Sequence, residues 1–167
     1  EKENRKATTE EQEILAQYVG WGGLSEVFDE SKGSWADEYV ELKALLNEDE
    51  YRSARESTLS AFYTSPVVIE SIYQVLDNLG FRRGNILEPS CGIGNFLGML
   101  PESMQESKLY GIELDAITGR IAKQLYQKES IAVEGYEDTK LPDSFFDVAI
   151  GNIPFGQFKV SDSVMIN

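Results

Sequence analysis

Residues 85–97, which read N-I-L-E-P-S-C-G-I-G-N-F-L, constrain the fold more than any other part of the chain. Ile86 and Leu87 are apolar and follow a polar turn, so they predict a short buried strand. Residues 88–94 predict a tight loop, and residues 95–100 predict the first turns of a helix. Gly92 and Gly94 would let the backbone approach a ligand without a side chain in the way. A strand, a glycine-bearing loop and a helix in this order predict a nucleotide-binding corner.

Two common phosphate-binding patterns do not fit this loop. A dinucleotide fingerprint needs a third glycine where Leu97 stands, and a P-loop needs a lysine that is absent here. Glu88 lies at the predicted carboxyl end of the strand, where its carboxylate would repel phosphates. The same carboxylate can accept hydrogen bonds from an amino or hydroxyl group, which favours a different class of ligand.

Residues 88–96 resemble motif I of class I S-adenosylmethionine-dependent methyltransferases. They are most similar to the form E-P-(A/S)-C-G-x-G-x-F of N6-adenine DNA methyltransferases. The resemblance implies a Rossmann-like α/β sheet and S-adenosyl-L-methionine as the cofactor. The simpler alternative is a glycine-rich turn in another α/β protein. In this loop, the resemblance implies cofactor contacts from Glu88, Ser90, Gly92, Gly94 and Phe96.

Composition narrows the possible functions. The 167 residues are 41% hydrophobic, which predicts a single globular domain with a core. No apolar run is long enough to span a membrane and no signal peptide is visible. Cys91 is the single cysteine, so we expect a reducing, cytoplasmic compartment. The chain has no histidine, which removes the commonest zinc ligand, and we expect no metal site. A net charge of −14 predicts weak DNA binding by the chain alone.

Residues 1–60 predict an N-terminal helical segment. Thr8 or Thr9 can cap a helix that continues to Tyr18, and helical patterns also cover residues 36–46 and 48–57. Trp21 stands among three glycines between these helices. It predicts either a binding loop or, more simply, an aromatic anchor that pins the segment to the core.

The next element is a helix with clear end signals. Ser65 can cap it, Pro66 suits its first position and Gly80 suits its end. Residues 61–66 resemble motif X of the same methyltransferases. The resemblance implies that Tyr63 and Thr64 lie beside the methionine end of the cofactor, whereas an ordinary capped core helix would need no such role.

Two further strands follow, each with an acidic end. Residues 108–113 predict a strand that ends at Glu113, which lies 25 residues after Glu88. An acid about 20 residues past a glycine loop commonly accepts hydrogen bonds from ribose hydroxyls. Motif II of the resembled family implies the same role for Glu113, with Leu114 beside it. Residues 131–133 predict the third strand, and motif III implies Glu137, or else Asp138, as the acceptor for the adenine amino group. A plain polar turn is the alternative.

Residues 145–150 predict a fourth strand, which the apolar run suggests is buried. It leads into N-I-P-F at residues 152–155, which resembles motif IV, N-P-P-(F/Y), of amino methyltransferases. The resemblance implies a catalytic set of Asn152, Ile153, Pro154 and Phe155. The Asn152 side-chain oxygen and the Ile153 carbonyl would accept the hydrogens of the target amine, and Phe155 would stack on a flipped base. Ile153 replaces the family's first proline.

The resemblance predicts a methyltransferase domain over residues 61–167, truncated after motif IV, with about four strands. Y-V-G-W-G-G-L at residues 18–24 is also similar to the methylase segment of large helicase–methylase proteins of mobile elements. We therefore expect part of a DNA adenine N6-methyltransferase, a restriction–modification type of activity. DNA would be bound through missing domains, and a helicase domain could lie in the same polypeptide.

The alternatives are a non-catalytic methylase-like binding module and, less favoured, a small-molecule or protein methyltransferase. Because extruding a base from a duplex costs a few kcal/mol, and because the chain is acidic, we expect residues 1–167 alone not to methylate DNA.

Overall fold

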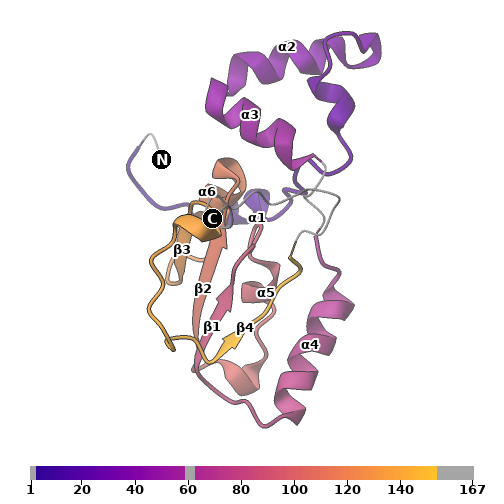
Figure 1. Cartoon of the computed structure of the whole chain (residues 1–167). Helices are drawn as coiled ribbons and strands as arrows, with labels where there is room; N and C mark the ends of the chain where they lie inside the picture. Colours follow the sequence, from indigo (N-terminus) through magenta and orange to yellow (C-terminus); the bar gives the residue numbers. More distant parts are fainter. Residues whose placement is uncertain (1–2, 59–62, 154–167) are drawn as a thin grey trace, which may run out of the picture.

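A computed structural model describes residues 3–58 and 63–153, so the expectations for Pro154 and Phe155 lie outside the described residues. Its centre is a four-stranded sheet in which all pairs are parallel, in the order β3-β2-β1-β4 (Figure 1). The strands are β1 (Asn85–Glu88), β2 (Lys108–Glu113), β3 (Ser130–Val133) and β4 (Val148–Ala149). The order reverses between β1 and β4, as in doubly wound sheets. The predicted Rossmann-like α/β fold is confirmed.

Three helices surround this sheet: α4 (Pro66–Asn78) before β1, α5 (Asn95–Gly98) after it, and α6 (Ala116–Leu125) between β2 and β3. Short 3-10 turns cover Glu102–Met104 and Tyr136–Asp138. The helix predicted over residues 95–100 is wrong in length, because α5 ends at Gly98. Leu100 precedes Pro101, and a residue before proline disfavours helical backbone angles. Pro66 begins α4 as predicted, but Ser65 makes no side-chain cap hydrogen bond.

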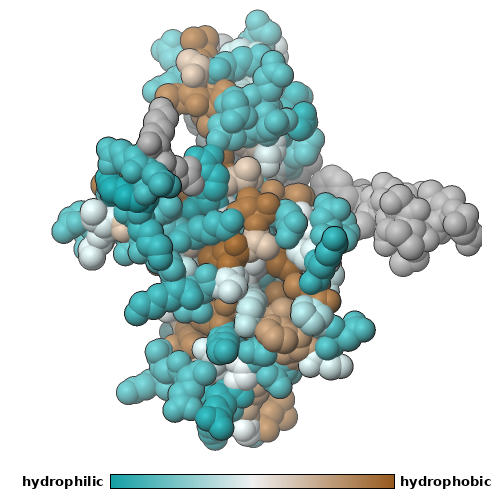
Figure 2. All heavy atoms as spheres, turned by 90° about the vertical axis from the view of Figure 1, so that its left-hand side faces the viewer, coloured by the Kyte–Doolittle hydropathy of each residue, from teal (hydrophilic) through white to brown (hydrophobic). Residues whose placement is uncertain are grey.

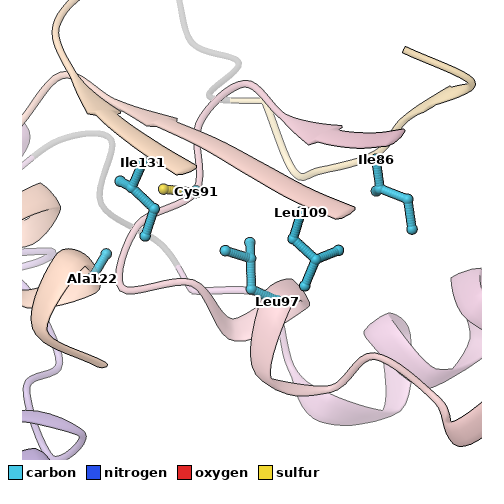
Figure 3. Close-up of a cluster of buried hydrophobic side chains, with 6 residues drawn as sticks. All are labelled: Ile86, Cys91, Leu97, Leu109, Ala122 and Ile131. Carbon is cyan, nitrogen blue, oxygen red and sulfur yellow. The ribbon is translucent and has the colours of Figure 1, made fainter. Parts of the chain in front are cut away.

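The main core lies between the sheet and the helices on one of its faces. In Figure 3, Ile86, Leu109 and Ile131 project from three adjacent strands toward Leu97 and Ala122. A second cluster joins α4 to α5, and within it the Tyr73 hydroxyl donates to the Phe96 carbonyl at 2.7 Å. Its buried members are Ile69, Tyr73, Phe96 and Met104. Both clusters hold the first residues after β1 in place.

The N-terminal segment contains α1 (Thr9–Leu15), α2 (Ala36–Leu45) and α3 (Glu48–Ser57), with 3-10 turns at Ser25–Phe28 and Gly33–Trp35. Thr8 and Asn47 form capping boxes that start α1 and α3. Helix α1 packs on α6, where the Gln12 side-chain amide donates to the Gln124 carbonyl at 2.6 Å. The segment is thus docked on the sheet domain through α6.

Trp21 packs within a third cluster, which is centred on Val27, Phe28 and Ala54. Its ring lies edge-on to Phe28 at a centroid distance of 5.6 Å and to Tyr18 at 6.3 Å. These contacts favour the aromatic anchor over the binding loop as the role of Trp21.

The expectation of a buried fourth strand over residues 145–150 is wrong. Only Val148–Ala149 pairs with β1, Ala149 is exposed and Phe145 is 37% exposed. Within the described residues, β4 has a neighbour on one side only, so the apolar run is not enclosed. Phe145 and Phe146 instead pack edge-on against Tyr110, at centroid distances of 5.4 and 5.3 Å.

The outer surface is largely hydrophilic on one face. Figure 2 shows hydrophilic side chains over most of the face that it presents. Among the described residues, no helix is long and apolar enough to cross a membrane.

Candidate functional site

A pocket opens at the carboxyl ends of β1, β2 and β4, beside the point where the strand order reverses. Its empty volume is about 640 Å³ with the open mouth included. Ligands of open α/β sheets bind at this location. The pocket is lined by Ser57, Tyr63, Thr64, Glu88, Ser90, Cys91, Gly92, Asn95, Phe96, Glu113, Asp115, Thr118 and Asn152.

The loop after β1 is held against the end of β2 by two backbone amides. The Cys91 amide donates to the Ile112 carbonyl at 2.8 Å, and the Gly92 amide donates to Glu113 Oε2 at 2.8 Å. Gly92 and Gly94 have φ angles of 57° and 87°, in the left-handed region that favours glycine. The glycines therefore allow the tight path that brings the loop backbone to the pocket wall.

Glu88 is the most unusual group of the site. Its residue is 4% exposed, and its Oε2 has no hydrogen-bond partner among the described residues. Burial, with a smaller effect from the Glu113 charge, raises the pKa of Glu88 to about 9. Buried polar groups are normally hydrogen-bonded. An unpartnered acid in a pocket wall is a ready acceptor for a ligand amino or hydroxyl group.

Glu113 both shapes the loop and faces the pocket. Its carboxylate accepts from the Gly92 and Asp115 amides, each at 2.8 Å. Burial raises the pKa of Glu113, and these amide hydrogen bonds oppose the rise. A carboxylate has about four lone-pair sites, so two remain for ligand hydroxyls.

Asn152 is positioned by the pairing of β4 with β1. The Ile150 amide donates to the Leu87 carbonyl at 2.9 Å, one step before the chain turns at Gly151. A side chain at Gly151 would lie 3.5 Å from the Glu88 side chain, so the start of the N-I-P-F stretch lies directly against β1 and its loop. Asn152 thereby reaches the same pocket as Glu88.

Eight predicted site residues share this pocket: Tyr63, Thr64, Glu88, Ser90, Gly92, Phe96, Glu113 and Asn152. The other predicted residues that the structure describes do not line it: Gly94, Leu114, Glu137, Asp138 and Ile153. The side chains of Leu114 and Ile153 are 71% and 62% exposed. Glu137 and Asp138 are exposed on the turn after β3. Gly94 instead packs its backbone against the Tyr126 ring.

Several lining residues were not predicted as site residues. Cys91 lies in the glycine loop and Asn95 begins α5, so their position between predicted site residues could have indicated them. Asp115 caps α6 by accepting from the Thr118 amide at 2.7 Å. Ser57 comes from α3 and reaches the pocket only through docking of the N-terminal segment, for which the sequence offers no local signal.

Comparison with known proteins gives related sequences but no matching protein-family model. The chain is 26% identical over 151 residues to "Defense against restriction protein B" of Escherichia phage P1, covering 89% of this chain and 5% of that protein. It is 29% identical to "Type II methyltransferase M.CvrRI" of Paramecium bursaria Chlorella virus XZ-6E, covering 71% of this chain and 29% of that protein. It is also 30% identical to "Type I restriction enzyme MjaIX methylase subunit" of Methanocaldococcus jannaschii, covering 56% and 18%.

The chain therefore spans less than a third of each of these relatives. Two of the three are named as a methyltransferase or methylase, which supports the methyltransferase part of the sequence-based prediction. The N6-adenine class and the fusion to a helicase stay predictions.

Proposed function

We propose that this chain is the cofactor-binding part of an S-adenosylmethionine-dependent DNA methyltransferase that acts on the N6 amine of adenine. One observation carries the proposal. Glu88, Glu113 and Asn152 match motifs I, II and IV, lie far apart in the sequence, and line one pocket at the carboxyl edge of the sheet. The relatives named as methyltransferases support S-adenosylmethionine as the cofactor.

The pocket residues fit such a cofactor. The unpartnered Glu88 carboxyl would accept from its amino group, and Glu113 would accept from its ribose hydroxyls. The bound cofactor supplies an electrophilic methyl group. Contact of Glu137 or Asp138 with the adenine amino group stays a prediction, because both lie outside the pocket lining.

Asn152 is proposed to orient the target amine. An exocyclic amine is a poor nucleophile because its lone pair is delocalised into the ring. The Asn152 side-chain oxygen and the Ile153 carbonyl would accept its two hydrogens and favour a pyramidal nitrogen. Stacking of the flipped base on Phe155 is part of the same proposal, and Phe155 lies outside the described residues.

A non-catalytic methylase-like module is the second candidate, favoured by one observation. Ile153 stands where the motif IV of the resembled family has its first proline. The chain's small share of each relative also supports a role within a longer polypeptide, in which DNA-binding and helicase segments would be supplied elsewhere.

Methyl transfer to an adenine-containing duplex tests the function directly. We expect no transfer by residues 1–167 alone, because a net charge of −14 opposes the phosphate contacts that dominate DNA affinity. We expect transfer by the complete reading frame that contains the chain, with loss on Asn152→Ala. Inactivity of the complete protein together with tight cofactor binding would favour the non-catalytic module. A duplex with N6-methyladenine at every adenine is the control for the target atom.

Replacement of Glu113 by alanine is expected to weaken cofactor binding by roughly 1–3 kcal/mol, because a buried hydrogen-bond acceptor is lost. The Gly92 amide also loses its partner, which loosens the loop. Glu102→Ala is the control, since that glutamate is exposed and lies outside the pocket lining. Calorimetric titration with S-adenosylmethionine measures both variants, and equal affinities would remove Glu113 from the site.

A further inference from the structure

Tyr63 connects the N-terminal segment to the glycine loop of the pocket. Its ring lies against two glycine backbones that are far apart in the sequence. A β-carbon added at Gly20 would lie 3.0 Å from the Tyr63 ring, and one added at Gly92 would lie 2.9 Å from its other edge. Gly20 is buried and has a φ of 72°. A side chain at either glycine would leave no room for the ring in this position.

Tyr18 lies near the far end of the same ring. The buried Thr118, at the start of α6, donates to the Tyr18 hydroxyl at 3.4 Å. Burial raises the pKa of Tyr63, and Thr118 opposes the rise. Tyr18 is thus bonded directly to a threonine that lines the pocket.

Other residues of the N-terminal segment make further contacts near Gly20 and the pocket. Trp21 packs on Phe28 within the third core cluster, and the Gly23 amide donates to the Thr58 carbonyl at 3.1 Å. Ser53 in α3 donates to Asp115 at 3.0 Å, and Asp115 lines the pocket. The N-terminal segment thus contacts two residues that line the pocket, Tyr63 and Asp115.

We propose that Tyr63 forms a wall of the cofactor pocket and that residues 18–21, which lie behind its ring and outside the pocket lining, hold it in place. Residues 18–21 hold the Tyr63 ring against Gly92, which preorganises the loop that Glu113 holds. Preorganisation lowers the ordering cost of binding and so raises affinity. This inference rests on the proposed function, since it assigns the affinity of that site to a segment outside the sheet domain.

Gly20→Ala tests the wall, with Gly23→Ala as the matched control. Both glycines have positive φ angles, 72° and 78°, so both variants carry similar backbone strain. Only the Gly20 variant meets the Tyr63 ring, because nothing lies within 4 Å of a β-carbon at Gly23. Comparison of the two isolates the Tyr63 contact from strain.

Hydrogen exchange at the Gly92 amide is the first readout and needs no ligand. We expect Gly20→Ala to speed this exchange by about tenfold and Gly23→Ala by less than about twofold. Tyr18→Phe, a milder change that keeps the ring, should give a smaller increase and serves if Gly20→Ala does not fold. Unchanged exchange in Gly20→Ala, or in Tyr18→Phe where Gly20→Ala does not fold, would overturn the inference.

Titration with S-adenosylmethionine is the second readout. We expect the dissociation constant to rise about tenfold in Gly20→Ala, and no further rise when Gly20→Ala is added to Tyr63→Leu, because residues that act through one contact are not additive. Full additivity would show that Gly20 does not act through Tyr63, which also overturns the inference. A wild-type chain that fails to bind would contradict the proposed function, and hydrogen exchange would still decide the inference.

Discussion

Glu88→Gln is expected to stabilise the folded chain in the absence of ligand and to weaken cofactor binding. The pKa of Glu88 is about 9 in the folded chain because of burial and the Glu113 charge, against about 4.3 in an unfolded chain. The folded state therefore binds a proton that the unfolded state releases. This contribution favours folding fully below the unfolded pKa and is lost as pH rises through the window up to the folded pKa.

At pH 7 the uptake of that proton costs up to about 4 kcal/mol of folding free energy. A glutamine of nearly the same shape does not titrate, so the variant avoids this cost. We expect its free energy of unfolding to exceed that of the wild type by about 1–3 kcal/mol at pH 7, with a growing gap toward pH 9 and a vanishing one near pH 4. Urea unfolding across this range measures it. Glu134→Gln, at an exposed position, is the control; parallel curves for wild type and Glu88→Gln would contradict the assignment.

The same substitution is expected to act in the opposite direction on binding. A positively charged ligand amino group would favour ionisation of Glu88, whereas glutamine cannot ionise. Hydrogen bonds to charged groups contribute about 1.5–3 kcal/mol. The dissociation constant for S-adenosylmethionine should therefore rise by more than about tenfold. A variant that is both more stable and a weaker binder identifies a functional residue, since sites often carry such strain.

Gly94→Ala is expected to cause the largest loss of stability in the glycine loop. Gly94 has a φ of 87°, and an added β-carbon would clash with the Tyr126 ring. Left-handed backbone costs a non-glycine residue about 1–2 kcal/mol, and overpacking adds about 1–3 kcal/mol. We expect a total of about 2–5 kcal/mol from these two causes. Tyr126 cannot move freely, because it packs against the main core.

Gly23→Ala separates the two causes, since it has a φ of 78° and open space around the new methyl group. We expect it to lose only about 1–2 kcal/mol. Chemical denaturation of both variants, followed by circular dichroism, measures the difference. Equal losses would show that the Tyr126 ring yields to the methyl group and that packing at Gly94 contributes little.

Local sequence signals predicted most of the elements. The predicted capping threonine placed the start of α1, and Glu113 was the correct end of β2. These signals work because caps and strand ends depend on neighbouring residues. The burial of β4 was predicted wrongly, since burial of a strand depends on whether a further strand lies beside it. Ala149 is exposed for this reason.

Only part of the candidate site was predicted, because local signals identify some of its residues and tertiary packing brings in the others. Glu88, Gly92 and Glu113 could be found from motifs, because Glu88 and Glu113 end β1 and β2 and Gly92 lies in the loop after β1. Ser57 and Thr118 enter the pocket through tertiary docking of helices, which no local pattern encodes. The turn after β3 directs Glu137 and Asp138 to solvent, a direction set by its backbone path.

Calorimetric titration of residues 1–167 with S-adenosylmethionine, and separately with NAD, tests the central claim most directly. The two ligands share an adenosine, but only the first carries an amino acid end for Glu88. We expect one site for S-adenosylmethionine, weaker binding by Glu88→Gln and little binding of NAD. Preference for NAD, or S-adenosylmethionine binding that Glu88→Gln leaves unchanged, would contradict it.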